Sequence, residues 1–242
     1  MRGVRVGVDF GGTKIEAAAL APSGGVVARV RRPNPGTYDA ALTTVRDLVV
    51  EAERQAGATG SVGVGIPGSL SPRTSAVRNA NSVWLNGRPF REDLERTLGR
   101  PVRLANDANC LALSEASDGA AAGAATVFAV IVGTGCGGGL VVNGAIVEGA
   151  NGIGGEWGHT PLPWPSAEEA TRAPCWCGRP LCMELFVSGP GFEADHRSAT
   201  GRDWRVPAIM DAARAGDEGA RAAYRRYIDR LGRGLAVICD VV

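Results

Sequence analysis

Short apolar runs rich in valine and isoleucine alternate along the chain with longer segments whose apolar residues recur every three or four positions. The short runs are typical of buried strands, and the longer segments are typical of amphipathic helices. We expect strands at residues 4–8, 15–20, 26–31, 62–66, 102–105, 127–132 and 140–142, and helices at residues 38–56, 91–98, 109–116 and 217–242. This alternation predicts an α/β fold with a largely parallel sheet.

One pattern occurs twice. A strand, a turn that contains Gly and Thr, and a returning strand are found at residues 6–20 and again at residues 129–142. A duplicated hairpin indicates two related subdomains that face each other across a cleft. We therefore expect a small α/β subdomain at residues 1–117 and a larger α/β subdomain at residues 118–242.

Composition narrows the classes of function. Among 242 residues, 45% are hydrophobic, so the chain can bury a sizeable core. The 26 basic and 25 acidic residues leave a net charge of +1 without a basic run, which argues against nucleic acid as a partner. No apolar stretch reaches membrane-spanning length, and the strand that begins at Val4 leaves no room for a signal peptide. We expect a cytoplasmic protein with no membrane partner.

Both glycine turns have the composition of a phosphate-binding loop. Adjacent glycines let backbone N–H groups approach a phosphate, while Thr13 and Lys14 add a hydroxyl and a cation, and Asp9 can hold Mg²⁺. A plain β-hairpin with turn glycines is the alternative, but two such turns in one chain favour phosphate binding. The candidates are Asp9, Gly11, Gly12, Thr13 and Lys14 in the first turn, and Gly133, Thr134, Gly135, Gly137 and Gly138 in the second.

Asn106 and Asp107 come directly after the strand expected at residues 102–105. Asp107 could simply cap the helix that follows. The carboxyl end of a parallel strand is also where α/β folds place catalytic groups. A carboxylate at this position can accept a hydroxyl proton while that oxygen attacks a phosphoryl group.

A cluster of thiols and an imidazole predicts a metal site. The candidate ligands are His159, Cys175, Cys177 and Cys182. Three thiolates and one imidazole satisfy tetrahedral Zn²⁺ without an open position, which is typical of a structural site. Buried free cysteines and a core histidine are the alternative. Zinc would bring Glu156 and Glu184 near one another, where carboxylates are suited to bind sugar hydroxyls. His196, in a polar segment, is expected to be solvated.

Together these motifs resemble the ROK family of sugar kinases, which has the actin-like ATPase (ribonuclease H-like) fold. The matching stretches are VGVDFGGTKIE, VGIPG, RLANDANCLALSEA, VIVGTGCGGGL, GGEWGHTPLPW and CWCGRPLCMELFVSGPGF. Within the family, three stretches look most like bacterial fructokinases of the manno(fructo)kinase type. They are NANSVWLNG at residues 79–87, TVFAVIVGTGCGGG and GHTPLPW. The resemblance implies ATP-dependent phosphorylation of a hexose, with fructose converted to fructose 6-phosphate.

The resemblance also implies a role for each candidate residue. Asp107 would be the general base that takes the proton from the sugar hydroxyl on C6. The residues that would hold the other hydroxyls are Asn106, Glu156, His159 and Glu184. His159 would also bind Zn²⁺ through one ring nitrogen, together with the three clustered cysteines, and the two hairpins would bind the phosphates of ATP with Mg²⁺. Family membership further implies a homodimer.

One departure from the family leaves alternatives open. Family members continue beyond the last helix with a strand, a glycine-rich turn and a further helix, so we expect a chain that is incomplete after Val242. A catalytically impaired or regulatory sugar-binding protein of the family is one alternative. An N-acetylglucosamine, glucose or mannose kinase of the same family is the other.

Overall fold

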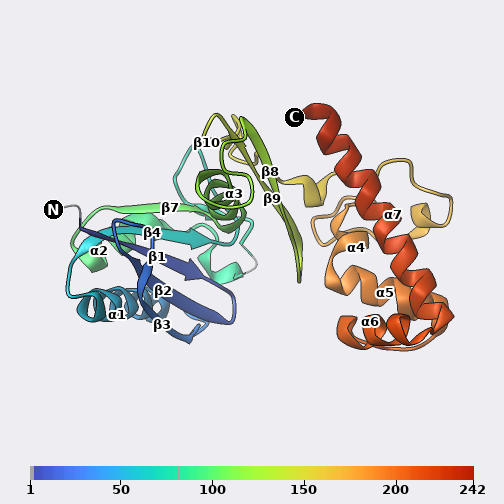
Figure 1. Cartoon of the computed structure of the whole chain (residues 1–242), viewed down its shortest axis with the longest axis horizontal. Coiled ribbons are helices and arrows are strands. Elements are labelled where there is room, and N and C mark those ends of the chain that lie inside the picture. Colours follow the sequence, from blue (N-terminus) through green and yellow to red (C-terminus); the bar gives the residue numbers. More distant parts are fainter. Residues whose placement is uncertain (1–2, 81) are drawn as a thin grey trace. The chain divides into compact units, whose positions relative to one another are not determined.

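The computed structural model describes residues 3–80 and 82–242, and these form two compact units (Figure 1). The N-terminal unit comprises the described residues up to Cys110 together with Glu148–Ile153. The C-terminal unit comprises Leu111–Val147 and Gly154–Val242. Asn81, which belongs to the segment 79–87 that resembles fructokinases, lies outside the described residues.

A five-stranded sheet forms the centre of the N-terminal unit, with the strand order β3-β2-β1-β4-β7. These strands are β1 (Val4–Phe10), β2 (Lys14–Leu20), β3 (Val26–Pro33), β4 (Gly60–Ile66) and β7 (Val102–Asn106). β4 is parallel to both β1 and β7, whereas β2 is antiparallel to both β1 and β3. The sheet is therefore mixed, and the expectation of a largely parallel sheet is wrong because consecutive hairpins join β1, β2 and β3.

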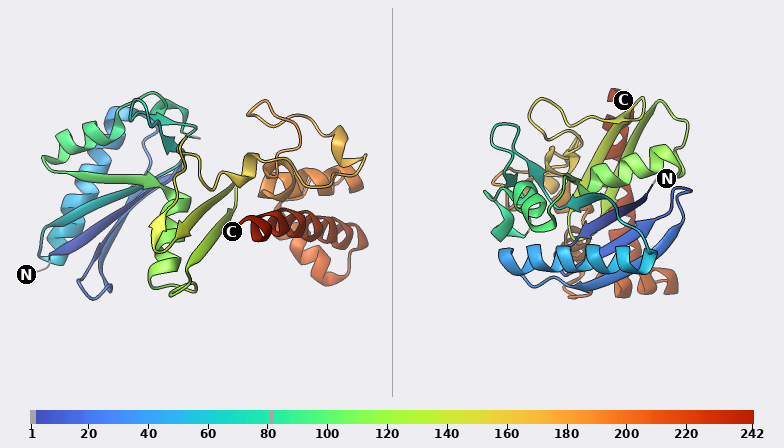
Figure 2. Two further views of the ribbon diagram at one scale, coloured as in Figure 1. Left: turned by 90° about the horizontal axis from the view of Figure 1, so that it is seen from above. Right: turned by 90° about the vertical axis from the view of Figure 1, so that its left-hand side faces the viewer.

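Helix α1 (Tyr38–Ala56) covers one face of this sheet (Figure 2). Its buried residues include Val45, Leu48 and Val49, which share one face of the helix and pack in the same core as the inward side chains of β1. The helix ends at Gly57, whose φ of 66° is the left-handed conformation that glycine adopts without strain. The shorter elements of this unit are β5 (Ser69–Leu70), β6 (Val77–Arg78), η1 (Val83–Leu85) and α2 (Phe90–Leu98).

The C-terminal unit contains an antiparallel sheet with the order β10-β9-β8, and a group of helices. Its strands are β8 (Thr126–Val132), β9 (Cys136–Val142) and β10 (Ala145–Ile146), and its helical elements are η2 (Trp157–His159), η3 (Glu169–Thr171), α4 (Glu184–Val187), α5 (Gly189–Thr200), α6 (Val206–Ala215) and α7 (Glu218–Val241). Helix α3 (Asp107–Ser117) begins in the N-terminal unit and continues into this one. There its Ala112 packs with Val127 and Val141 of the sheet.

Helix α7 runs along α4, α5 and α6 (Figure 1), and a buried ion network joins it to α5 and η3. The Arg230 guanidinium, 5% exposed, donates to Glu169 at 2.7 Å and to Asp195 at 2.6 Å. Arg226 also donates to Asp195, and Arg233 also donates to Glu169. Burial alone would raise the pKa of Glu169, but hydrogen bonds from Arg233 and Arg230 outweigh it and lower the pKa to about 2. Hydrogen bonds from Arg226 and Arg230 likewise outweigh burial and lower the pKa of Asp195, so both carboxylates are ionised at neutral pH.

The expectation that His196 is solvated is wrong. The residue lies in α5 and is fully buried. Its ring stacks on Trp204 at 5.2 Å between centroids. The neighbouring Asp195 is buried as well, paired with Arg226 and Arg230, so this part of α5 faces the interior of the unit. Among the described residues, no helix combines the length and the apolar character needed to cross a membrane.

Candidate active site

The carboxyl ends of β1, β4 and β7 lie at one edge of the N-terminal sheet because these strands are parallel. Asp9 of β1 and Asn106 of β7 therefore approach the same edge. Asn106 Oδ1 accepts hydrogen bonds from the backbone N–H groups of Ala108 at 2.9 Å and Asn109 at 3.1 Å, which is the arrangement of a helix N-cap. Its Nδ2 donates to the Gly68 carbonyl at 2.8 Å. The Asn106 side chain thus ties α3 to the turn that follows β4.

Asp107 is the first residue of α3, and its side chain is exposed. Its Oδ1 accepts a hydrogen bond from the Ala108 N–H at 2.8 Å. Desolvation by the surrounding protein raises the pKa of Asp107 above its usual value, and the negative charge of Asp9 raises it further. A carboxylate with a raised pKa is a stronger base, so the position combines access with the basicity that proton abstraction needs.

The first glycine turn, residues 11–13, connects β1 to β2. A Cβ on Gly11 would lie 2.8 Å from the Lys14 carbonyl oxygen, so the tight turn itself requires glycine there. Asn34 Nδ2 donates to the Gly11 carbonyl at 2.7 Å and holds the turn in place. Gly12, Thr13 and Lys14 are exposed. Their backbone N–H groups, hydroxyl and ammonium are therefore accessible to an anionic ligand.

The second glycine turn is shorter than the sequence suggests. Residues 133–135 connect β8 to β9, and Gly137 and Gly138 lie within β9, paired with Ile131 and Val130. A Cβ on Gly138 would lie 2.7 Å from Phe128 Cζ and 2.9 Å from Trp157 Cδ1. Close packing accounts for glycine at this position. The phosphate-binding role implied for Gly133, Thr134, Gly135, Gly137 and Gly138 stays a prediction.

The segment that carries Glu156 and His159 lies directly against β9. A Cβ on Gly158 would lie 1.9 Å from the Cys136 carbonyl oxygen, and Gly155, with a φ of +87°, is similarly close to Gly138. The Trp157 indole N–H donates to the Gly137 carbonyl at 2.8 Å. Glycines on both segments permit this approach, which fixes the backbone on either side of the candidate sugar ligands.

The four predicted metal ligands come together in the C-terminal unit. Their ligand atoms all lie within 4.8 Å of one another in His159, Cys175, Cys177 and Cys182. Cys177 Sγ lies 3.5 Å from Cys182 Sγ, and Cys175 Sγ lies 3.8 Å from His159 Nδ1. Tetrahedral Zn²⁺ with Zn–S bonds of about 2.3 Å requires sulfur atoms about 3.8 Å apart. The donor set and its spacing therefore fit a closed structural zinc site, with Nδ1 of the imidazole as its ligand atom.

Glu184, the first residue of α4, is held by two N–H hydrogen bonds and a weaker contact from the Cys175 thiol at 3.9 Å, all from other parts of the C-terminal unit. Its Oε2 accepts from the Cys136 N–H at 3.1 Å, which ties α4 to the start of β9. Its Oε1 accepts from the Trp176 indole N–H at 2.7 Å. The sequence singles out Glu184 but does not distinguish Trp176 from the other tryptophans. Its place between two metal ligands is the one local signal that points to it.

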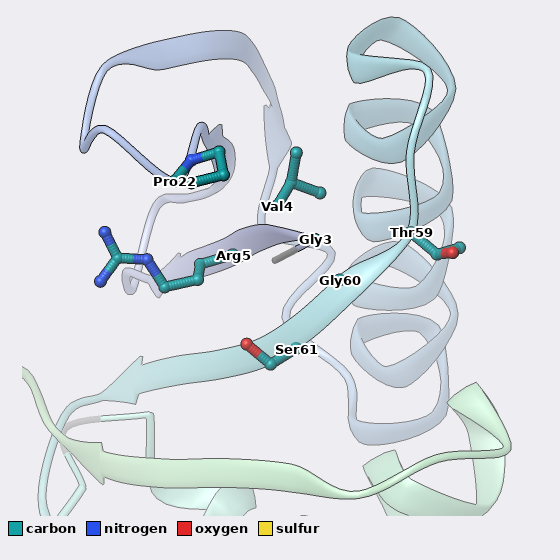
Figure 3. Close-up of a pocket in the computed structure, with 7 residues that line it drawn as sticks. All are labelled: Gly3, Val4, Arg5, Pro22, Thr59, Gly60 and Ser61. Carbon is teal, nitrogen blue, oxygen red and sulfur yellow. The ribbon is translucent and has the colours of Figure 1, made fainter. Parts of the chain in front are cut away.

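A shallow pocket of about 690 Å³ lies at the opposite edge of the N-terminal sheet (Figure 3). It is lined by Gly3, Val4, Arg5, Pro22, Thr59, Gly60 and Ser61. All of these residues except Pro22, which follows β2, come from the amino ends of β1 and β4, whereas Asp9 and Asp107 lie at the carboxyl ends. The pocket is therefore separate from the candidate catalytic carboxylates.

The paired hairpins, the carboxylates at the ends of parallel strands and the Cys₃His cluster define one family of proteins. The chain belongs to the ROK family, whose model matches residues 5–242. The fold is that of the actin-like ATPases, shared with a ROK hexokinase from Thermus thermophilus (33% identity, TM-score 0.86, 98% of this chain and 78% of that one). A ROK glucokinase from Streptomyces griseus, solved with glucose and AMPPNP, is 27% identical with a TM-score of 0.79, over 99% of this chain and 80% of its own.

Sequence relatives refine this resemblance. An N-acetyl-D-glucosamine kinase from Pectobacterium carotovorum is 42% identical over 230 residues, which cover 93% of this chain and 76% of that protein. A kinase of the same name from Shigella boydii is 39% identical over 98% of this chain and 80% of its own length. The resemblance to ROK sugar kinases is confirmed. The finer resemblance to fructokinases is not supported by these relatives.

Proposed function

We propose that this protein is an ATP-dependent sugar kinase that phosphorylates N-acetyl-D-glucosamine, rather than the fructose that its motifs first suggested. The similarity to N-acetyl-D-glucosamine kinases, at 42% identity over most of the chain, carries the choice of sugar. The accessible Asp107 with its raised pKa supports the choice of reaction.

In this reaction Asp107 accepts the proton of the sugar hydroxyl on C6 as that oxygen attacks the γ-phosphorus of ATP. The new bond joins the sugar oxygen to phosphorus, and the bond from phosphorus to the ADP oxygen breaks. The products are the sugar 6-phosphate and ADP, and the proton remains on Asp107 until it passes to solvent. Asp9 would hold Mg²⁺, which neutralises charge on the phosphates when bound.

The other candidate residues would bind the nucleotide and the sugar. Thr13, Lys14 and the N–H groups of the two glycine turns would bind the phosphates of ATP. The acceptors and donors for the remaining sugar hydroxyls would be Asn106, Glu156, His159 and Glu184. Zn²⁺ would be held by His159 and the three clustered cysteines, and it would supply rigidity rather than chemistry because its four ligands leave no open position. His159 Nε2 would then remain available to the sugar.

The test measures ADP release from this chain with Mg-ATP and N-acetylglucosamine, glucose, mannose or fructose. We expect the highest kcat/KM with N-acetylglucosamine, and loss of turnover with retained sugar binding in Asp107→Asn. A higher kcat/KM with fructose would reject the choice of sugar. Calorimetric sugar binding by the unmodified chain without any ADP release would instead favour a regulatory sugar-binding protein. The homodimer implied by the family stays a prediction, which sedimentation would test.

A further inference from the structure

Trp176 combines high exposure with a specific polar contact. Its side chain is 72% exposed, although it lies between two metal ligands, Cys175 and Cys177. The indole N–H donates to Glu184 Oε1 at 2.7 Å. The indole ring also meets the His159 imidazole edge to face, with centroids 5.0 Å apart and planes at 83°. Trp176 thus contacts two of the residues to which we assign the sugar hydroxyls.

The hydrogen bonds of Glu184 leave it able to bind a ligand. A carboxylate has about four acceptor sites, two on each oxygen. The Cys136 N–H occupies one site on Oε2, and the Trp176 N–H occupies one site on Oε1, where the Cys175 thiol is a weak second donor at 3.9 Å. Oε2 therefore keeps an acceptor site for a hydroxyl, and Oε1 would keep one when Cys175 holds zinc as a thiolate. The N–H donors on both oxygens fix the direction in which the carboxylate points.

Packing does not explain this tryptophan. Large aromatic side chains stabilise a protein chiefly through the area that they bury, and Trp176 leaves most of its area in water. The other indole N–H with a described partner, that of Trp157, belongs to a side chain only 3% exposed. An exposed hydrogen bond gains strength when a ligand excludes water from it.

We propose that Trp176 positions Glu184 for sugar binding through its indole N–H, and that the bound sugar covers its exposed ring. This inference rests on the proposed function, because it takes Glu184 as a sugar ligand. Trp176 is then a positioning residue whose loss weakens sugar binding without changing the reacting groups.

Trp176→Phe tests the hydrogen bond because it keeps an aromatic ring and removes the N–H donor. We expect a rise of about tenfold in the Kd and KM for N-acetylglucosamine, the size that corresponds to one charge-assisted hydrogen bond. The kcat and the KM for ATP should stay near their wild-type values, since the change removes binding rather than chemistry. Trp164→Phe is the matched control, because Trp164 is 68% exposed in the same unit and should leave sugar affinity unchanged.

A fluorescence measurement tests coverage of the ring without changing Trp176. In Trp164→Phe, Trp176 is the most exposed of the remaining tryptophans, so acrylamide should quench it, and saturating N-acetylglucosamine should protect it. Unchanged quenching in a sugar-bound protein would overturn the coverage of the ring. A wild-type sugar affinity in Trp176→Phe would overturn the positioning role, as would a lowered affinity that follows a loss of bound zinc.

Failure of the proposed function has a different signature. If the unmodified chain binds none of the four sugars in calorimetry, the proposed function and this inference fall together. If the unmodified chain binds sugar and Trp176→Phe binds it with the same affinity, this inference alone is overturned.

Discussion

Gly234 on α7 lies against the two segments that carry candidate sugar ligands. A Cβ at this position would lie 2.3 Å from Met183 Cε and 2.9 Å from Trp157 Cζ3. These side chains are 1% and 3% exposed and belong to one hydrophobic core. Gly232 lies two residues earlier on the same helix, and a Cβ there would meet no atom within 4 Å. The two glycines therefore allow a matched test of close packing.

Two opposing effects determine how much each substitution changes the free energy of unfolding. Replacing a helical glycine by alanine stabilises the helix by about 0.5–1 kcal/mol, since alanine has less backbone freedom to lose on folding. Gly232→Ala should show this gain alone. In Gly234→Ala, overpacking costs about 1–3 kcal/mol, because Met183 can bend at its end but the Trp157 ring is held by its neighbours. The net expectation for Gly234→Ala is a loss of up to about 2.5 kcal/mol.

Thermal and urea unfolding of the two variants and the unmodified chain would measure the difference. At about 2–4 °C per kcal/mol for a chain of this size, Gly234→Ala should lower Tm by up to roughly 10 °C and Gly232→Ala should raise it slightly. The kinetics should also separate the variants. Trp157 and Met183 are next to Glu156 and Glu184, so Gly234→Ala should raise the KM for the sugar while Gly232→Ala leaves it unchanged.

The reasoning is refuted if Gly234→Ala is as stable as Gly232→Ala. That result would mean that the helix and the two segments have room for a methyl group, and that glycine at position 234 has no packing role. A loss of stability with an unchanged KM would limit Gly234 to stability and remove its link to the sugar ligands.

The charges and the metal ligands give four further predictions. Folding raises the pKa of Asp107, so its negative charge costs stability above that pKa. Asp107→Asn should therefore abolish turnover without lowering Tm at pH 7, and a lower Tm would contradict the desolvation of this carboxylate and its repulsion from Asp9. Removal of zinc by a chelator should lower Tm, and Cys182→Ser should lose the single zinc ion per chain that elemental analysis is expected to find. Arg230→Met removes the shared partner of two buried carboxylates, which keep Arg233 and Arg226, and should cost about 1.5–3 kcal/mol in urea unfolding. Since the pKa of Glu169 falls from 4.5 to about 2 on folding, its contribution to stability should be complete above about pH 4.5 and lost as the pH falls toward 2, and Arg230→Met should reduce that acid dependence.

Local pattern in the sequence predicts much of this fold. The helix expected at residues 38–56 is α1 with the same bounds, and the last helix differs by one residue at each end. Both hairpins also form as expected. These features depend on periodicity and turn composition within a few residues, which the chain shows directly. The metal cluster is predicted for a similar reason, because three of its four ligands lie within one short loop.

Contacts between distant segments were decided only by the tertiary structure. Gly138 belongs to a segment with the composition of a phosphate-binding loop. Its neighbours are nevertheless Phe128 and Trp157, and no local pattern indicates these contacts. His196 lies among polar residues and is nevertheless fully buried against Trp204. The partners of Arg230 are 61 and 35 residues away in sequence.

The candidate site likewise has residues that the sequence identifies and contacts that only the tertiary structure shows. Sequence identifies Asp107, the metal ligands and Glu184 by residue type and spacing. It does not indicate that Trp176 would donate to Glu184, because a side chain's role depends on which surfaces packing brings within hydrogen-bond distance. Residue types and their spacing along the chain therefore determined the elements and the chemistry available. Packing of segments far apart in sequence decided which groups are buried, paired or exposed, since those contacts depend on three-dimensional distance and not on order along the chain.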